Sequence, residues 1–306
     1  MKKLRFVVNL MTRDNDFQLA QAAAAQQAAR RHDVEVDVAY ADSDPITQST
    51  QLLKIIQGDP STHPSAILFQ PIGGTALPQV ARAAAEAGIG WVVLNREAEY
   101  VSELRASSRA PIFSISVDHK DVGRIQGRQM AALLPGGGSV LYIQGPTGSI
   151  AARDRTVAML STKPDNTRLT TLRGQWTEQS AQRSVSSWLT LTTSQKAQVD
   201  LIVAQNDAMA LGVRKAFEGL PENDRDRWLN LLYTGCDGLP QTGQEWVRRG
   251  LLAATIVVPT NTDLAITLLV QALRDGIRPA ENVRTAPASF PPIETLLTAR
   301  SAHLRA

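Results

Sequence analysis

The chain has 306 residues, enough for about two domains of ordinary size, and its hydrophobic (43%) and charged (20%) fractions are those of a globular protein. Its 32 basic and 29 acidic residues leave a net charge of only +3, which provides no broad positive field for nucleic acid or an anionic membrane. A single cysteine, Cys236, excludes an intrachain disulfide, and no apolar run approaches the ~20 residues of a membrane span.

The N-terminus has only part of a secretion signal. Met1-Lys2-Lys3 is a basic start, but the apolar stretch at 4–10 contains Arg5 and Asn9. No small-residue cleavage site follows it. We therefore expect either a mature chain or a protein that stays in the cytoplasm.

Short apolar runs alternate with helical patterns along the chain. Two series of runs predict strands, at 4–10, 34–39, 66–69, 91–94 and 112–117, and at 139–143, 168–172, 201–204, 231–235 and 253–258. Helical patterns lie between them, for example at 17–31, 52–56, 149–160, 207–218 and 262–275. The runs are nearly continuous rather than alternating, as in strands buried on both faces of a parallel sheet. The sequence thus predicts an α/β protein with doubly wound parallel sheets.

The strand series is doubled, which predicts two lobes. Residues 1–117 form one set and 118–258 another, and no Gly-, Ser- or Pro-rich linker separates them. A short connection at Val117-Asp118 fits lobes joined by hinge strands better than two independent domains on a flexible tether.

Polar and aromatic residues gather at the ends of the predicted strands. Ligands of open parallel sheets bind beyond the carboxyl ends of the strands, so these residues are the candidate site. The first series offers Asn9, Asn15, Phe17, Gln70, Asn95 and Arg96, and the second offers Arg153, Trp176, Asn206 and Asp237.

These residue types suit a ligand with many hydroxyl groups. Amides donate and accept, carboxylates accept, and arginine donates through a rigid fork, while aromatic rings can pack on the C–H face of a sugar. Structural interpretations remain open: Asn206 and its neighbour Asp207 as helix caps, Asp237 as a turn residue, Trp176 as a surface aromatic, and Arg153, which competes with Arg155, as half of a surface ion pair. For Asn9 and Gln70 the two interpretations are about equal.

Five segments carry a resemblance to a known family: AQNDAMALG at 204–212, GPTGSIAARDR at 145–155, TGCDGLP at 234–240, LAATI at 252–256 and VVLNRE at 92–97. Together with the strand order, they make the chain similar to periplasmic sugar-binding proteins of the ribose-binding type, the class I solute receptors of ABC transporters, whose fold is shared by effector domains of the lactose-repressor type. The resemblance spans nearly the whole chain.

The resemblance implies the function, the site and the domain boundaries. A small sugar would bind between two lobes that close about a hinge, with contacts from Asn15, Phe17, Asn95, Arg96, Arg153, Trp176, Asn206 and Asp237, and less firmly from Asn9 and Gln70. Chain crossings near 117, 258 and 288 would place 1–117 and 259–288 in one lobe, and 118–258 and 289–306 in the other. The helix at 262–275 would return to the first lobe, and the last strand would join the second.

The implied setting is the periplasm, or the cytoplasm if this is the native N-terminus. The expected partners are a sugar and the membrane permease of an ABC transporter, with no nucleic acid, no membrane insertion and no cofactor or metal, and the expected state is a monomer.

The chain departs from the family at two places. Asn95-Arg96 stands where members commonly have Asp-Arg, which removes a charged acceptor. Val257-Val258-Pro259 stands where many members have a glutamine, which loses a polar contact at the hinge or moves it to Thr260 or Asn261.

Two other functions remain. A cytoplasmic sugar sensor of the lactose-repressor type would carry an N-terminal DNA-binding headpiece, but the first predicted strand already begins at residue 4. An enzyme is disfavoured because His32, His63, His119 and His303 are scattered, and no HExxH, GxSxG, P-loop or GxGxxG pattern occurs.

Overall fold

The computed structural model describes residues 3–74, 76–195 and 197–297. These form two compact units, one made of the described residues up to Val117 with Thr260–Thr285, the other of Asp118–Pro259 with the described residues from Ala286 onward. The chain thus passes between the units after 117, 259 and 285, beside the implied crossings near 117, 258 and 288. Residues 298–306, expected in the second lobe, lie outside the described residues, as does His303.

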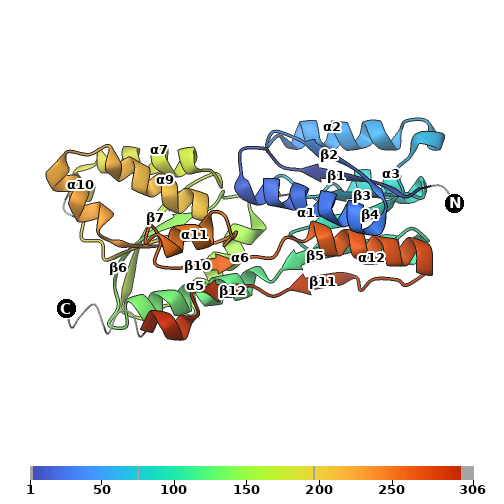
Figure 1. Ribbon diagram of the computed structural model, residues 1–306. Helices are drawn as coiled ribbons and strands as arrows, with labels where there is room; N and C mark the ends of the chain where they lie inside the picture. The colour runs from blue at the N-terminus through green and yellow to red at the C-terminus, as the bar shows by residue number, and fades with distance from the viewer. Residues whose placement is uncertain (1–2, 75, 196, 298–306) are drawn as a thin grey trace. The chain divides into compact units, whose positions relative to one another are not determined.

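The first unit contains a six-stranded parallel sheet with the strand order β11-β5-β4-β3-β1-β2 (Figure 1). The strands are β1 (Arg5–Leu10), β2 (Glu35–Tyr40), β3 (Ala66–Phe69), β4 (Gly90–Leu94), β5 (Ile112–Val117) and β11 (Asn282–Thr285). Strand β11 reaches this sheet because the chain returns to the first unit after residue 259.

Helices cover both faces of this sheet. On one face α1 (Asp16–His32) and α12 (Thr262–Asp275) pack against Phe6, Val8 and Leu10. On the other, α2 (Pro45–Ile56), α3 (Pro78–Glu86) and α4 (Tyr100–Ser107) pack in a cluster that includes Val7. Successive residues of a strand point to opposite faces, so burial on both faces requires the continuous apolar runs seen in the sequence. A short 3₁₀ helix, η1 (Pro60–Thr62), precedes β3.

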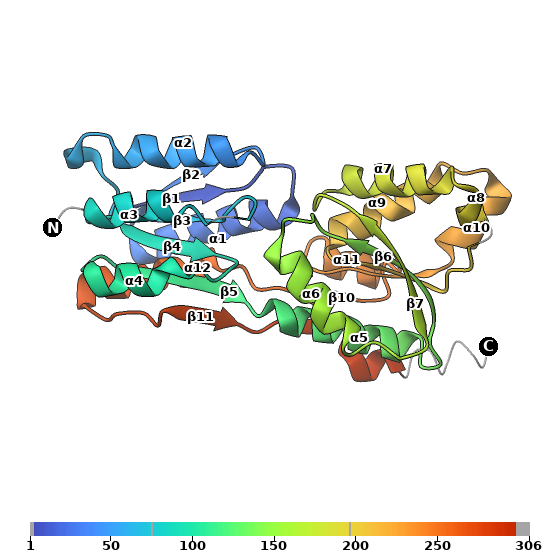
Figure 2. The same ribbon diagram turned by 180° about the vertical axis from the view of Figure 1, so that it is seen from behind.

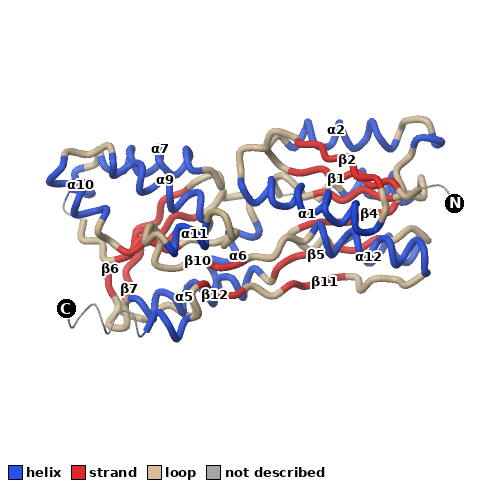
Figure 3. The backbone as a smooth tube through the Cα atoms, viewed as in Figure 1, coloured by secondary structure: helices blue, strands red, loops and turns tan. Residues whose placement is uncertain are grey.

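The second unit is built in the same way on a four-stranded parallel sheet, β7-β6-β8-β9. Its strands are β6 (Gly138–Gln144), β7 (Thr167–Arg173), β8 (Leu201–Ala204) and β9 (Leu232–Thr234). The helices α5 (His119–Leu133) and α6 (Ile150–Leu160) cover one face (Figure 2). The other face is covered by α7 (Glu178–Leu189), α9 (Asp207–Glu218) and α10 (Glu222–Leu229). Figure 3 shows the helices around the strands in each unit.

Two strands of the second unit differ from the predicted pattern. β7 is an edge strand that pairs with β6, and several side chains of its sequence TRLTTLR are exposed. The apolar run at 253–258 forms the short β10 (Thr255–Val257), which pairs antiparallel with β12 (Ala288–Phe290). Isolated parallel bridges join Thr234 to Ala254 and Asp237 to Val257. The short helices α8 (Thr192–Gln195) and α11 (Gly243–Arg248) complete the unit.

Among the described residues, no helix combines the length and the apolar character needed to cross a membrane.

Candidate functional site

The first unit places its polar candidates at the carboxyl ends of β1, β3 and β4. Asn9, near the end of β1, is fully buried, and both atoms of its amide are bonded. Its Nδ2 donates to Oε1 of Gln51 (2.8 Å), and its Oδ1 accepts from Nε2 of Gln48 (2.8 Å). Gln48 also donates to the backbone oxygen of Gln70 (2.9 Å). Asn9 therefore has a structural role, because its buried side-chain amide links the end of β1 to Gln48 and Gln51.

Gln70 and Asn95 lie together, linked by a hydrogen bond. Nδ2 of Asn95 donates to Oε1 of Gln70 (3.0 Å), and the same oxygen accepts from Nε2 of Gln18 (2.9 Å). Oδ1 of Asn95 accepts from Nδ2 of Asn261 (2.7 Å), the residue just before α12. Asn95 has a φ of 61°, a left-handed conformation that asparagine tolerates better than most residues. Four side-chain amides thus meet at this edge of the sheet.

Arg96 is half-buried and is held by backbone carbonyls. Its Nη1 and Nη2 donate to the oxygens of Gly73 (3.2 Å) and Gly74 (3.1 Å). Its Nε is buried and has no hydrogen-bond partner among the described residues. Burial lowers the pKa of the guanidinium because removal of water disfavours the charge. The group nevertheless stays a donor, since arginine titrates far above neutral pH.

Asn15 and Phe17 begin α1. Asn15 is the N-cap, and its Oδ1 accepts from the backbone N–H of Gln18 (3.2 Å). This bond satisfies one of the backbone donors that a helix leaves open at its start. Both Asn15 and Phe17 are largely buried, at 9% and 7% exposed. Asn15 therefore already has a structural role at this strand end.

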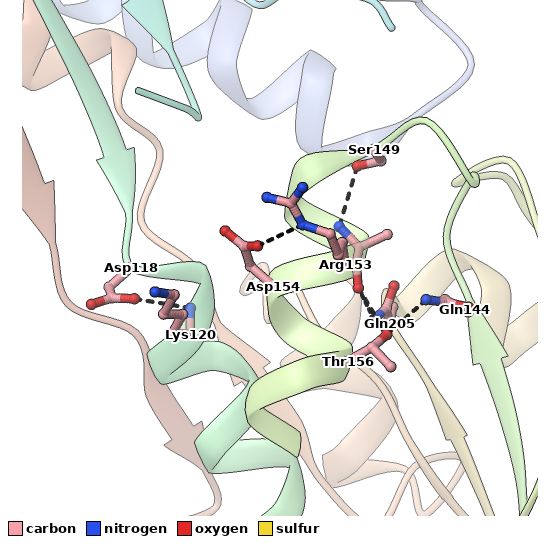
Figure 4. Close-up of polar contacts among 9 residues, drawn as sticks. Asp118, Lys120, Gln144, Ser149, Arg153, Asp154, Thr156 and Gln205 are labelled. Atoms are coloured by element: carbon pink, nitrogen blue, oxygen red, sulfur yellow. Dashed lines mark hydrogen bonds and ion pairs between the residues drawn. The ribbon is translucent and has the colours of Figure 1, made fainter. Parts of the chain in front are cut away.

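Arg153 and Arg155 stand two residues apart on α6 and have different environments. Arg153 is exposed, and its Nε contacts Oδ1 of Asp154 (3.2 Å), as Figure 4 shows. An exposed pair of this kind contributes only about 0–1 kcal/mol, so Arg153 can readily exchange Asp154 for another acceptor. Arg155 is buried, and its Nη1 donates to the backbone oxygen of Gln205 (2.6 Å). The sequence left these two arginines in competition, and Arg155 is the one with a structural role.

Trp176 follows β7 and is held from three sides. The Nδ2 of Asn206 donates to its backbone oxygen (3.0 Å), and the guanidinium carbon of Arg155 lies 5.6 Å from the ring centroid. A Cβ atom on Gly145 would lie 2.4 Å from the indole ring, so only glycine fits there. Trp176 has a φ of 65°, a strained value for a bulky residue. This ring therefore belongs to a defined local arrangement.

Asn206 and Asp207 join β8 to α9. Asn206 is 2% exposed and is the N-cap of α9, since its Oδ1 accepts from the N–H of Met209 (3.0 Å). Asp207 is buried, and its carboxylate accepts from Thr255 Oγ1 (2.6 Å) and from the N–H of Gly238 (2.8 Å). Burial raises the pKa of Asp207 well above its usual range, and the charge of Asp237 raises it further. Asn206 therefore is the N-cap of α9, and this role does not exclude a contact with a ligand.

Asp237 follows β9 and lies in the turn before Gly238. Its φ is 110°, its backbone N–H donates to the oxygen of Ile256 (3.0 Å), and its backbone oxygen accepts from the N–H of Val258 (3.0 Å). The side chain is partly exposed. These backbone bonds attach the turn to the segment containing β10.

Three glutamines that the sequence did not indicate also contribute to the candidate site: Gln18, Gln48 and Gln205. Gln205 is fully buried; its Oε1 accepts from the N–H of Gly145 (2.9 Å), and its Nε2 donates to Tyr142 Oη (2.6 Å). The only signal was position, since Gln18 lies three residues after Asn15 and Gln205 directly precedes Asn206.

The described residues contain no cluster of three or more His, Cys, Asp or Glu side chains placed to hold a metal ion. Burial raises the pKa of the Cys236 thiol to about 12. A thiol in this environment is a poor nucleophile, because the thiolate is the reactive form.

Comparison with known proteins gives consistent results. A family profile described as a periplasmic binding protein domain matches residues 6–276. The xylitol-binding protein of Mycolicibacterium smegmatis is 28% identical over 273 residues, which cover 87% of this chain and 70% of that protein. The ribose import binding protein of Escherichia coli is 27% identical over 190 residues, or 62% of this chain and 58% of that protein.

Solved structures resemble the chain over almost its full length. An ABC transporter solute binding protein from Actinobacillus succinogenes with bound D-allose has a TM-score of 0.79 at 19% identity, covering 97% of this chain and 100% of that one. A Mycobacterium smegmatis structure in complex with β-D-fucofuranose has a TM-score of 0.78 at 20% identity, covering 99% and 96%. At these identities the likeness shows a shared fold.

Proposed function

We propose a receptor function for this chain, which belongs to the periplasmic binding protein domain family: it binds a small sugar or sugar alcohol and presents it to the permease of an ABC-type transporter. It would act as a monomer in the periplasm, without catalysis. The relatives named above bind xylitol or ribose according to their names, and the solved structures hold D-allose or β-D-fucofuranose. All four compounds carry several hydroxyl groups.

One observation supports this proposal: each unit has its own set of polar and aromatic side chains at or just beyond its strand ends. The first unit has the amides of Gln70 and Asn95 beside the guanidinium of Arg96. The second has the indole ring of Trp176 after β7, Arg153 on α6, which follows β6, and Asp237 after β9. Donors, acceptors and an aromatic face are what a polyol requires. We propose that one ligand is bound by both sets, with Asn15, Phe17 and Asn206 adding contacts.

The test is a thermal-shift screen followed by titration calorimetry. The panel comprises aldopentoses, hexoses, deoxysugars, sugar alcohols and inositols. A compound at 100 times its dissociation constant should raise the free energy of unfolding by about 2.7 kcal/mol. If no compound of the panel binds, the proposed ligand class is wrong.

Arg153→Ala should weaken binding of the best compound about 10- to 100-fold, because a charged hydrogen bond contributes about 1.5–3 kcal/mol. Its unfolding midpoint should stay near that of the wild type, since Arg153 is exposed and its pair with Asp154 is weak. Arg183→Ala, an exposed arginine on α7, is the matched control. Equal affinity of both variants and the wild type would remove Arg153 from the site.

A further inference from the structure

A row of side-chain amides runs along the strand ends of the first unit, and the backbone determines its orientation. The N–H of Met11 donates to Oε1 of Gln18 (3.0 Å), so the nitrogen of Gln18 must point the other way. That nitrogen donates to Oε1 of Gln70 (2.9 Å), and Nδ2 of Asn95 donates to the same oxygen (3.0 Å). A backbone N–H cannot be turned into an acceptor, so Met11 decides which atom of each amide points where.

This orientation makes position 95 a required donor toward Gln70. A carboxylate at 95 would put an acceptor against the acceptor oxygen of Gln70. Turning the amide of Gln70 would relieve that contact, but its nitrogen would then face the nitrogen of Gln18. Turning Gln18 as well would set its nitrogen against the N–H of Met11. One mismatched contact remains in every arrangement, and a mismatched polar contact away from water is unfavourable.

The guanidinium of Arg96, which lies beside this row, is bonded to carbonyl oxygens rather than to a carboxylate. Arg96 donates to the backbone oxygens of Gly73 and Gly74, and no ion pair of Arg96 occurs among the described residues. The acidic residue next in sequence, Glu97, is bonded to Arg284 (2.7 Å). The strand ends of β3 and β4 therefore combine neutral amides with one positive charge.

We propose that Asn95 is a specificity-determining residue. Because this position requires an amide beside Arg96, the first unit's part of the site selects ligands whose polar groups are oxygens over sugars that carry an ammonium group. An ammonium placed there would lose water without gaining an anionic partner, and it would meet the charge of Arg96. The inference rests on the proposed function and narrows its substrate class to neutral sugars, sugar alcohols or sugar acids.

Stability without ligand tests the orientation of the row. Asn95→Asp suits the backbone, because aspartate tolerates the left-handed conformation much as asparagine does. Gln70→Glu introduces the same charge but keeps acceptors toward Gln18 and Asn95. Asn282→Asp, exposed on β11, keeps its acceptor role toward Ser114 and controls for added charge in the same unit.

The unfolding midpoint of Asn95→Asp should fall about 2–6 °C further than those of Gln70→Glu and Asn282→Asp. If the unfolding midpoint of Gln70→Glu fell further than that of Asn95→Asp, the amides would point the other way, and the proposal would be wrong.

Calorimetry tests the selectivity. Each neutral sugar that binds in the panel is paired with its own amino sugar and its own acid, for example D-galactose with D-galactosamine and D-galacturonate. The wild type and Asn282→Asp should bind the amino sugar at least about tenfold more weakly than the neutral parent, and Asn95→Asp should reduce this ratio to about threefold or less.

Tighter binding of the sugar acid than of its neutral parent would show that Arg96 contacts a carboxylate, and tighter binding of the neutral parent would show that Arg96 contacts a hydroxyl. Equal binding of neutral and amino sugars by the wild type would overturn the specificity assignment and leave the receptor function standing. Failure of every sugar to bind would instead reject the receptor function, and the stability comparison would still decide the orientation of the amides.

Discussion

At the scale of single residues, Asp207 shows how a polar group is built into the second unit. Its two carboxylate oxygens bind Thr255 and the backbone of Gly238. Cβ atoms on Gly235 and Gly243 would lie 2.1 and 2.0 Å from those oxygens, so glycine at both positions makes room for the carboxylate. Burial is the main cause of the raised pKa of this carboxyl group, because removal of water disfavours its charged form.

This raised pKa predicts a pH dependence of stability. The folded protein holds the proton of Asp207 to higher pH than the unfolded chain, so the contribution of this residue is fully present below its ordinary value of 3.8 and is lost as the pH rises through the folded value. The wild type should therefore lose stability relative to Asp207→Asn as the pH rises from about 4 toward neutrality. The amide can still accept from Gly238 and donate to the hydroxyl of Thr255.

Urea unfolding of both proteins across this range measures the difference. Asp165→Asn, in an exposed turn between α6 and β7, is the control for the loss of a carboxylate. A difference between the wild type and Asp207→Asn that does not change with pH would show that Asp207 stays ionised in the fold.

At the scale of elements, the attachment of α12 to α1 completes the first unit. Gln21 of α1 is fully buried, and its Oε1 accepts from the backbone N–H groups of Asn261 (2.9 Å) and Thr262 (3.1 Å). The start of α12 has no capping bond from the side chain of Asn261. Gln21 therefore satisfies open backbone donors of a helix that lies about 240 residues further along the chain.

Gln21→Met should lower the free energy of unfolding by roughly 2–4 kcal/mol, because it keeps the approximate volume but leaves two buried N–H groups without an acceptor. Gln26→Met, at an exposed position of the same helix, should change it by less than about 0.5 kcal/mol. Chemical denaturation without ligand measures both values. A loss for Gln21→Met as small as that of the control would mean that water or a shifted backbone supplies the missing acceptor.

At the scale of the whole molecule, the chain crosses three times between two separately packed units, after 117, 259 and 285. Crossings of this kind leave each hydrophobic core intact while a few residues absorb a change in backbone angles. If one sugar is bound by polar sets on both units, it binds best to the conformation in which both reach it. Such a ligand must shift the population toward that conformation.

We therefore predict that the molecule becomes more compact when its preferred sugar binds. Small-angle scattering with and without saturating ligand should show a smaller radius of gyration, with no change in the helix content measured by circular dichroism. Arg153→Ala at the same ligand concentration should show a smaller shift, because fewer molecules are occupied. An unchanged radius with binding confirmed by calorimetry would leave a static site.

The sequence by itself determined the fold class and the location of the candidate groups. Continuous apolar runs require strands buried on both faces, and the structure has such strands at β1, β3, β4 and β8. Its place between strand and helix also offered Asn206 as a helix cap, and the structure makes it the N-cap of α9. These properties are local, because burial pattern and capping depend on a residue and its near neighbours in the chain.

Only the tertiary structure decided which polar side chains serve the fold and which are exposed at the strand ends. Arg153 and Arg155 are equivalent in sequence, and the packing of α6 on the sheet buries one and exposes the other. The amide row joins Gln18, Gln70 and Asn95 from three distant segments. The direction of each amide follows from hydrogen bonds between segments far apart in sequence, so no local pattern contains it.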